Sequence, residues 1–158
     1  MNLITTLKGL FRPAAVEPDL VHPLFGNMMA EVCGDEDDFW QSEIVFKPLN
    51  CDIYVNVLAG SEGPSDAQSE FYEHFVQNYQ LDFELVAPAL IKEYEEWFQK
   101  KLEGTFSDNF EFSGLLIPKN GDRSNPWDLS FDCLADKFGH MFTAEIKDDV
   151  VLNVRTDG

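Results

Sequence analysis

Hydrophobic and polar residues alternate along several short stretches of the chain, as expected for strands with one buried face. The pattern is clearest in residues 51–58, where Ile53, Val55 and Val57 alternate with Asp52, Tyr54 and Asn56. Turn-forming segments separate these stretches, such as Lys147-Asp148-Asp149 between the last two. The expected strands are residues 25–32, 39–46, 51–58, 127–134, 141–146 and 150–154, with a further short one at 115–118.

The spacing of the apolar residues along the chain changes after residue 60. Apolar residues then recur every fourth position at Ala67, Phe71, Phe75 and Tyr79, which is one stripe of an amphipathic helix. Ser65 is a suitable N-cap for it. A second and broader stripe runs through residues 82–102 and contains Pro88. Because proline suits the first turn of a helix and disrupts its interior, we expect a second helix that begins near Pro88.

These elements predict an α+β fold: an antiparallel β-sheet, made of a meander and a C-terminal hairpin, with a pair of amphipathic helices packed on one face. Residues 22–158 would form this single domain. Residues 1–21 are expected to be a short amphipathic helix followed by a proline-containing linker. They lack the basic start and continuous apolar run of a signal peptide, which favours a cytoplasmic protein.

Composition adds an unusual charge. The chain has 158 residues, of which 44% are hydrophobic, so it can bury a core. It carries 29 acidic and 11 basic residues, for a net charge of −18. Most of the excess lies between Pro13 and Ile91, where Lys47 is the single base. Nucleic acids and anionic membranes are therefore not expected partners. The charge either serves solubility alone or steers a basic protein partner toward this chain.

The sequence offers no strong catalytic, cofactor or metal motif. Cysteines at 33, 51 and 133 form no Cys-x-x-Cys pair, and residues 35–38 lack the spacing of a calcium loop. Cys133 and His140 flank a turn and could meet as a thiol and its base, which leaves an enzyme as a minor alternative. We expect no catalytic residues, no metal and no cofactor.

The order of several segments resembles a known group. HPLFG at 22–26, FWQSEIVF at 39–46, CDIYVNVLAG at 51–60, FYEHFVQNY at 71–79 and the segment 129–154 follow one another. This order resembles small bacterial α+β families of uncharacterised domains that occur as immunity proteins beside polymorphic or contact-delivered toxins. The turn 135–140 retains part of the acidic, His and Gly pattern of such families. The resemblance implies a cognate toxin as partner, bound by surface residues without catalysis.

Charge and resemblance together favour an immunity protein, or antitoxin, that covers a basic surface or cleft of its toxin. An acidic protein that mimics DNA or acts as a scaffold for a host factor is the alternative. Tyr72 is expected on the surface as an aromatic anchor, because it lies off the main apolar stripe. The expected partner-binding residues are Asp35, Glu36, Asp37, Asp38, Glu62, Asp66, Glu70, Tyr72 and Glu73.

Overall fold

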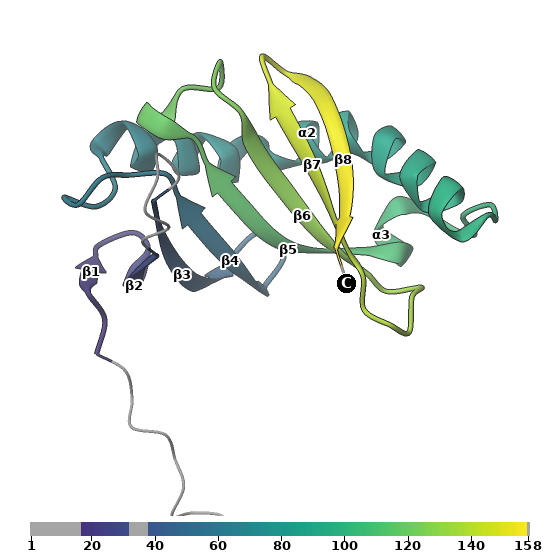
Figure 1. Cartoon of the computed structure of the whole chain (residues 1–158), viewed down its shortest axis with the longest axis horizontal. Helices are drawn as coiled ribbons and strands as arrows, with labels where there is room; N and C mark the ends of the chain where they lie inside the picture. The colour runs from purple at the N-terminus through teal and green to yellow at the C-terminus, as the bar shows by residue number, and fades with distance from the viewer. Residues whose placement is uncertain (1–16, 32–37, 158) are drawn as a thin grey trace, which may run out of the picture.

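The computed structural model describes residues 17–31 and 38–157 as a single eight-stranded sheet with one long helix across it (Figure 1). The strands follow one another in space in their sequence order. A short helix, α3 (Phe106–Asn109), and a 3-10 turn, η1 (Lys119–Gly121), complete the fold. The strands are β1 (Leu20–His22), β2 (Gly26–Glu31), β3 (Phe39–Phe46), β4 (Cys51–Val57), β5 (Phe110–Ile117), β6 (Trp127–Cys133), β7 (Met141–Lys147) and β8 (Val150–Asp157).

The sheet is mixed, which corrects the expected antiparallel meander. Neighbouring strands run antiparallel except β4 and β5, which are parallel. Two parallel neighbouring strands need a long connection, because the chain must return to the end of the sheet where the first strand begins. Here that connection contains α2 (Asp66–Phe98). The strands after this helix therefore extend the first sheet, on the far side of β4. They do not form a separate hairpin.

The expected pair of helices is also wrong, because α2 is one continuous helix of 33 residues. Pro88 lies inside it, where a proline costs about 3 kcal/mol through the missing hydrogen bond to the carbonyl of residue 84. Pro88 is exposed, so water can satisfy that carbonyl. Val86 and Leu90 on either side are fully buried, and each gains about 1.5–3 kcal/mol from burial. The burial of these side chains against the sheet therefore offsets the cost of the proline, and the helix continues past it.

The N-terminal end of α2 is determined locally, as the sequence predicted. The Ser65 side chain accepts a hydrogen bond from the Gln68 backbone, and the Gln68 side chain accepts one from the Ser65 N–H. The buried Gln68 amide also donates to the carbonyls of Leu58 (2.7 Å) and Pro118 (3.0 Å). One side chain thus ties the helix start to the segments that follow β4 and β5.

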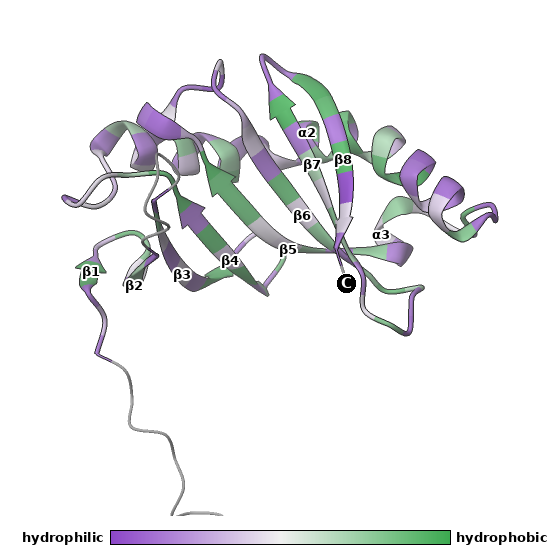
Figure 2. Ribbon diagram, in the orientation of Figure 1, coloured by the Kyte–Doolittle hydropathy of each residue, from purple (hydrophilic) through white to green (hydrophobic). Residues whose placement is uncertain are grey.

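The core lies between α2 and the sheet face that it covers. Figure 2 shows the bands of apolar and polar residues that alternate along the strands. Trp127, Phe46, Phe75 and Phe131 are among the largest fully buried side chains, and edge-to-face ring contacts link many of the aromatic residues. Five of the expected strands are confirmed to within one residue at each end, and β8 ends three residues later than expected. β1 was not expected, β5 is longer than the segment proposed there, and the expected helix in residues 1–21 lies almost wholly outside the described residues.

Candidate functional site

The side of the sheet away from α2 carries no helix in the described part of the chain (Figure 1). We call it the uncovered face: the side chains of strands β3 to β8 that alternate with the buried ones. Its central hollow has a volume of about 680 Å³. The hollow is lined by Phe39, Gln41, Tyr54, Asn56, Leu58, Ser113, Gly114, Leu115, Leu116, Asp128, Ser130, Asp132, Met141, Thr143, Arg155 and Asp157.

Strand register places the residues of this face in transverse rows. The middle row runs from Tyr54 through Gly114, Ser130 and Thr143 to Arg155, each paired with the next across the sheet. The hydroxyls of Ser130 and Thr143 share a hydrogen bond of 2.9 Å. Gly114 has no side chain, so the row is open between the half-exposed ring of Tyr54 and Ser130. A Cβ atom at Gly114 would lie 3.3 Å from that of Ser130.

One carboxylate of the uncovered face is neutralised inside the molecule. Asp128 accepts a hydrogen bond of 2.6 Å from Arg155, whose other terminal nitrogen lies 3.8 Å from Glu145. Burial raises the pKa of Asp128 despite this bond. Burial disfavours the charge of Arg155, but the hydrogen bond to Asp128 and the negative charges of Asp128, Glu145 and Asp157 together outweigh it, so the pKa of Arg155 rises. Arg155 is therefore already engaged by carboxylates of its own chain.

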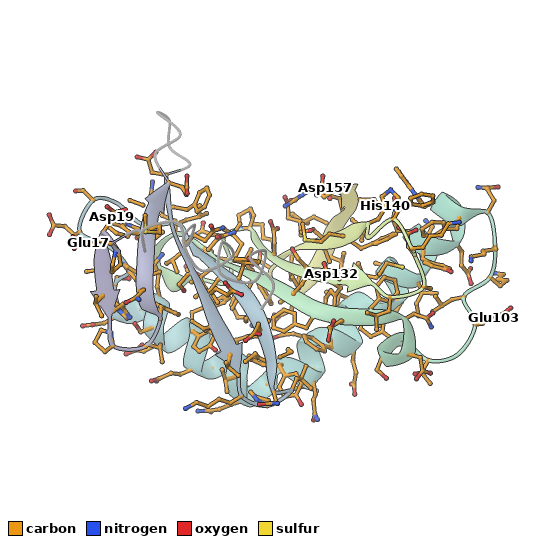
Figure 3. All side chains as sticks on the ribbon, turned by 90° about the horizontal axis from the view of Figure 1, so that it is seen from below. Glu17, Asp19, Glu103, Asp132, His140 and Asp157 are labelled. Carbon is orange, nitrogen blue, oxygen red and sulfur yellow. The ribbon has the colours of Figure 1, made fainter. Side chains whose placement is uncertain are left out.

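A second, more polar hollow adjoins the first. It lies where β4 and β5 begin and where β6 ends. It has a volume of about 330 Å³ and carries three exposed carboxylates, those of Asp52, Glu111 and Asp132. Asp132 and Ser113 line both hollows, so the two adjoin each other. Among the described residues, none of the three carboxylates has an ion-pair partner. We call Asp52, Glu111 and Asp132 the carboxylate triplet; Figure 3 labels Asp132 among them.

The negative charges of this triplet affect the pKa of the Cys51 thiol. Burial is the largest cause that raises its pKa, and the negative charges of Glu111 and Asp52 raise it further. Ser113 lies at a register shift between β5 and β6, where the strand bulges. Its hydroxyl oxygen is out of contact with solvent and has no hydrogen-bond partner among the described residues. The rim shared by the two hollows thus combines an unneutralised negative field with an unused hydroxyl.

The structure places the expected partner-binding residues elsewhere, at the start of α2. Asp66, Glu70 and Glu73 are exposed and follow one side of the helix, with Glu62 in the preceding loop. Asp38 lies by that loop, in a hollow shared with Gly60 and Gly63. Asp35, Glu36 and Asp37 lie outside the described residues. The described acids of this set therefore lie around the start of α2 and the loop before it.

Tyr72 is not on the surface, and this expectation is wrong. Its side chain is 7% exposed and packs edge-to-face on Phe25, whose turn between β1 and β2 covers it. Burial raises the pKa of Tyr72 to about 12. The helical stripe at every fourth residue predicted only the contacts with the sheet. The β1–β2 hairpin adds a second set of contacts on the adjoining side of α2, which local periodicity does not reveal.

The geometry does not assemble a thiol and a base at Cys133 and His140. Cys133 is buried, and burial raises the pKa of its thiol. The His140 ring contacts the Asp136 carboxylate through Nδ1, within the turn between β6 and β7. Across the described residues, no set of three potential ligands is close enough to hold a metal ion. No described helix is long and apolar enough to cross a membrane.

The uncovered face was missed at the sequence level, although its signal is visible there. Asp52, Tyr54 and Asn56 alternate with the buried residues of β4, and Asp128, Ser130 and Asp132 do so in β6. Alternation shows that these residues share the polar side of each strand. It does not show that β4 and β6 lie one strand apart, since the order of the strands depends on the α2 crossover.

Comparisons with known proteins add no relative to this picture. No protein-family model, curated protein or solved structure matches the chain.

Proposed function

We propose that this chain is a cytoplasmic immunity protein that binds a toxin with a basic surface or cleft and blocks it through the uncovered face. The observation that carries the proposal is an open, hollowed sheet face with an excess of negative charge. The resemblance to immunity families and the net charge of −18 support the same function. No catalytic step is assigned to the chain.

The face has the composition of a protein-binding surface. Carboxylates lie beside apolar and aromatic groups, among them Tyr54, Leu116 and Met141. Tyrosine is enriched among the residues that dominate binding energy, and Tyr54 is 52% exposed although it lies in a central strand. A surface meant only for solubility has no need of an exposed aromatic ring at the centre of a sheet. The mixture suits a partner that offers cations around an apolar contact.

The size of the face is also sufficient. Six strands spaced about 4.8 Å apart, each with about seven residues that rise about 3.3 Å, span roughly 25 by 25 Å. A stable interface buries about 800 Å² on each partner, and a corrugated face of these dimensions supplies an area of that order. Carboxylates around the rim would accelerate encounter, and the hollow would hold the partner after contact.

Co-expression tests this function directly. The toxin domain encoded next to this gene is expressed in a bacterial host with and without the chain, and growth is recorded. We expect growth to be restored and the two proteins to elute together from a sizing column. An unrelieved toxin and separate elution would disprove the proposal. Binding to several unrelated basic proteins with similar affinity would instead support a DNA-mimicking protein.

Matched charge reversals locate the surface. The double variant Asp132→Lys and Asp157→Lys changes the uncovered face, and Glu70→Lys with Glu73→Lys changes the start of α2 by the same net charge. We expect the first pair to abolish protection and the second to leave it almost intact. The reverse result would place the toxin on the start of α2, as the sequence predicted.

A further inference from the structure

The first 12 residues differ from the rest of the chain in charge and in pattern. They contain two bases, Lys8 and Arg12, and no acid, so they carry a net charge of +2. Their large apolar residues recur at spacings that predict one stripe of an amphipathic helix: Leu3, Ile4, Leu7, Leu10 and Phe11. A helix of this length is marginal in water by itself, so the stripe needs a surface to cover it.

The central hollow of the uncovered face offers an apolar surface of suitable size. Its volume is about 680 Å³, and the Tyr54 ring that lines it is 52% exposed. Four half-buried apolar side chains line it as well: Phe39, Leu58, Leu116 and Met141. A helix of 12 residues extends about 18 Å, which fits within the roughly 25 Å of the face.

Charge favours this face over a second apolar hollow, which lies between β3 and α2. That hollow has a volume of about 320 Å³ and is lined by one charge of each sign, Lys47 and Glu73. The two hollows of the uncovered face are lined by five carboxylates and one base, Arg155, which already bonds Asp128. A segment with two bases and no acid is therefore attracted to the uncovered face.

The described chain begins close to one end of the central hollow. The Asp19 carboxylate accepts a hydrogen bond of 2.9 Å from the Ala30 backbone, and Ala30 pairs with Trp40 at the start of β3. Two strand spacings, or about 10 Å, thus separate Asp19 from β3, where Phe39 lines the hollow. Figure 3 shows Asp19 at this end of the sheet. The chain from Arg12 to Asp19 can span about 23 Å, so the first 12 residues can reach the hollow.

We propose that residues 1–12 of this chain lie across the uncovered face in the free protein, with their apolar stripe over the central hollow and Lys8 and Arg12 beside the carboxylates of its rim. The short tether keeps the segment at a local concentration on the order of millimolar, so even a weak contact is populated. The segment must leave before a partner can bind there, a consequence that rests on the proposed function. It therefore lowers the apparent affinity of the face for that partner.

Nuclear magnetic resonance on the whole natural chain tests the docked segment without a partner. We expect nuclear Overhauser contacts from the methyl groups of Leu7 and Leu10 to the Tyr54 ring, equally strong at about 0.05 mM and about 1 mM protein. Contacts that strengthen with concentration would mean that the segment binds another copy, and would overturn the proposal. The absence of contacts would also overturn it, as would contacts only to Val45 and Val76 in the hollow between β3 and α2.

Matched variants test whether the apolar stripe makes the contact. Leu7→Ser with Leu10→Ser removes the centre of the stripe and should shift backbone amide signals in segments 53–57, 128–132 and 141–145, which lie on the face. Thr5→Ala with Thr6→Ala changes residues off the stripe and should shift these signals at least about threefold less. The indole signal of the buried Trp127 reports the fold of the core in each variant. Equal shifts from both pairs, or none from the first, would overturn the proposal.

A second set of variants separates a fitted contact from general attraction to an acidic protein. Lys8→Glu with Arg12→Glu should weaken the Overhauser contacts at least about threefold, because the bases no longer match the rim. Lys92→Glu with Lys101→Glu makes the same change in net charge at exposed residues near the end of α2 and should leave the contacts almost unchanged. Equal weakening by both pairs would show that net charge alone acts, and the assignment to this face would be wrong.

Toxin binding distinguishes the failure of this inference from the failure of the proposed function. If the face is free of the segment about a quarter of the time, Leu7→Ser with Leu10→Ser should bind the toxin about fourfold more tightly than the natural chain. Unchanged or weaker binding would show that the segment does not cover the toxin site, and the inference would be wrong. A natural chain that neither binds the toxin nor protects cells would refute the proposed function, while the Overhauser contacts would still decide whether the segment is docked.

Discussion

Arg123 shows how much one residue contributes to holding this molecule together. Its guanidinium bonds Asp82 on α2 at 2.5 Å and Asp149 in the β7–β8 turn at 2.9 Å. It also stacks on Trp127, with 4.5 Å from the guanidinium carbon to the ring centroid. Burial disfavours its charge, but the bonds to Asp82 and Asp149 prevail and the pKa of Arg123 is raised. Helix, loop and hairpin therefore depend on the same side chain.

We expect Arg123→Met to destabilise the protein by about 3 kcal/mol, because it leaves the carboxylate of Asp82 buried without a partner. Asp82 is 5% exposed, so water cannot replace the lost bonds. Urea unfolding would measure the change. Arg123→Met combined with Asp82→Leu should recover much of it. A single variant as stable as the natural chain would show that the pair contributes nothing.

Asp136 gives a prediction about pH. Burial opposes its charge, but hydrogen bonds from the His140 and Phe138 backbones and from the His140 ring outweigh burial and lower the pKa of Asp136 to about 2. A folded pKa below the ordinary value of 3.8 stabilises the folded state above that value. The contribution is lost as the pH falls toward about 2. The turn between β6 and β7 should therefore loosen in acid.

The comparison with Asp136→Asn measures this contribution. We expect the difference in free energy of unfolding between the two proteins to be constant above about pH 5 and to shrink between about pH 4 and pH 2. Urea unfolding across this range would provide the values. A difference that stays constant down to pH 2 would mean that the Asp136 carboxylate is not held as described.

At the scale of elements, α2 both builds the core and makes the uncovered face possible. At about 1.5 Å per residue its 33 residues extend roughly 50 Å, enough to lie across all the central strands. It covers one side of the sheet and, as the crossover, brings β5 next to β4, with β6 on the far side of β5. Without this element the members of the carboxylate triplet would not be neighbours.

Pro88 is the weak position of that helix, and Pro88→Ala should stabilise the protein by up to about 3 kcal/mol. The alanine restores the hydrogen bond to the carbonyl of residue 84 without altering a buried contact, since Pro88 is exposed. Thermal and urea unfolding would show the gain. Pro88→Gly is the control and should gain about 1 kcal/mol less. A loss of stability in Pro88→Ala would show that the helix needs a bend there to fit the sheet.

At the scale of the whole molecule, the net charge of −18 acts against folding, because like charges are held closer together in the compact state. Salt screens this repulsion. We expect the urea midpoint to rise between about 0.01 M salt, where the Debye length is about 30 Å, and about 1 M, where it is about 3 Å. NaCl and KCl should act alike. A midpoint that falls with salt would mean that internal ion pairs outweigh the repulsion.

The sequence predicted most individual elements well. Strands β3, β4, β6, β7 and β8 and the capping residue Ser65 are where alternation, period and turn chemistry place them. Local signals suffice for these because each depends on neighbours a few residues away. The prediction failed at Pro88 and Tyr72, where contacts with distant strands or with the β1–β2 turn override a local preference.

By itself, the sequence determined the strands, the location of the charge and the amphipathic character of α2, because composition and periodicity are properties of the chain alone. Only the tertiary structure decided that one helix crosses the sheet, that β4 and β5 are parallel, and that Asp52, Glu111 and Asp132 meet on an uncovered face. Residues far apart in sequence become neighbours through burial of α2 against the sheet. That driving force depends on the area buried, which no local pattern encodes.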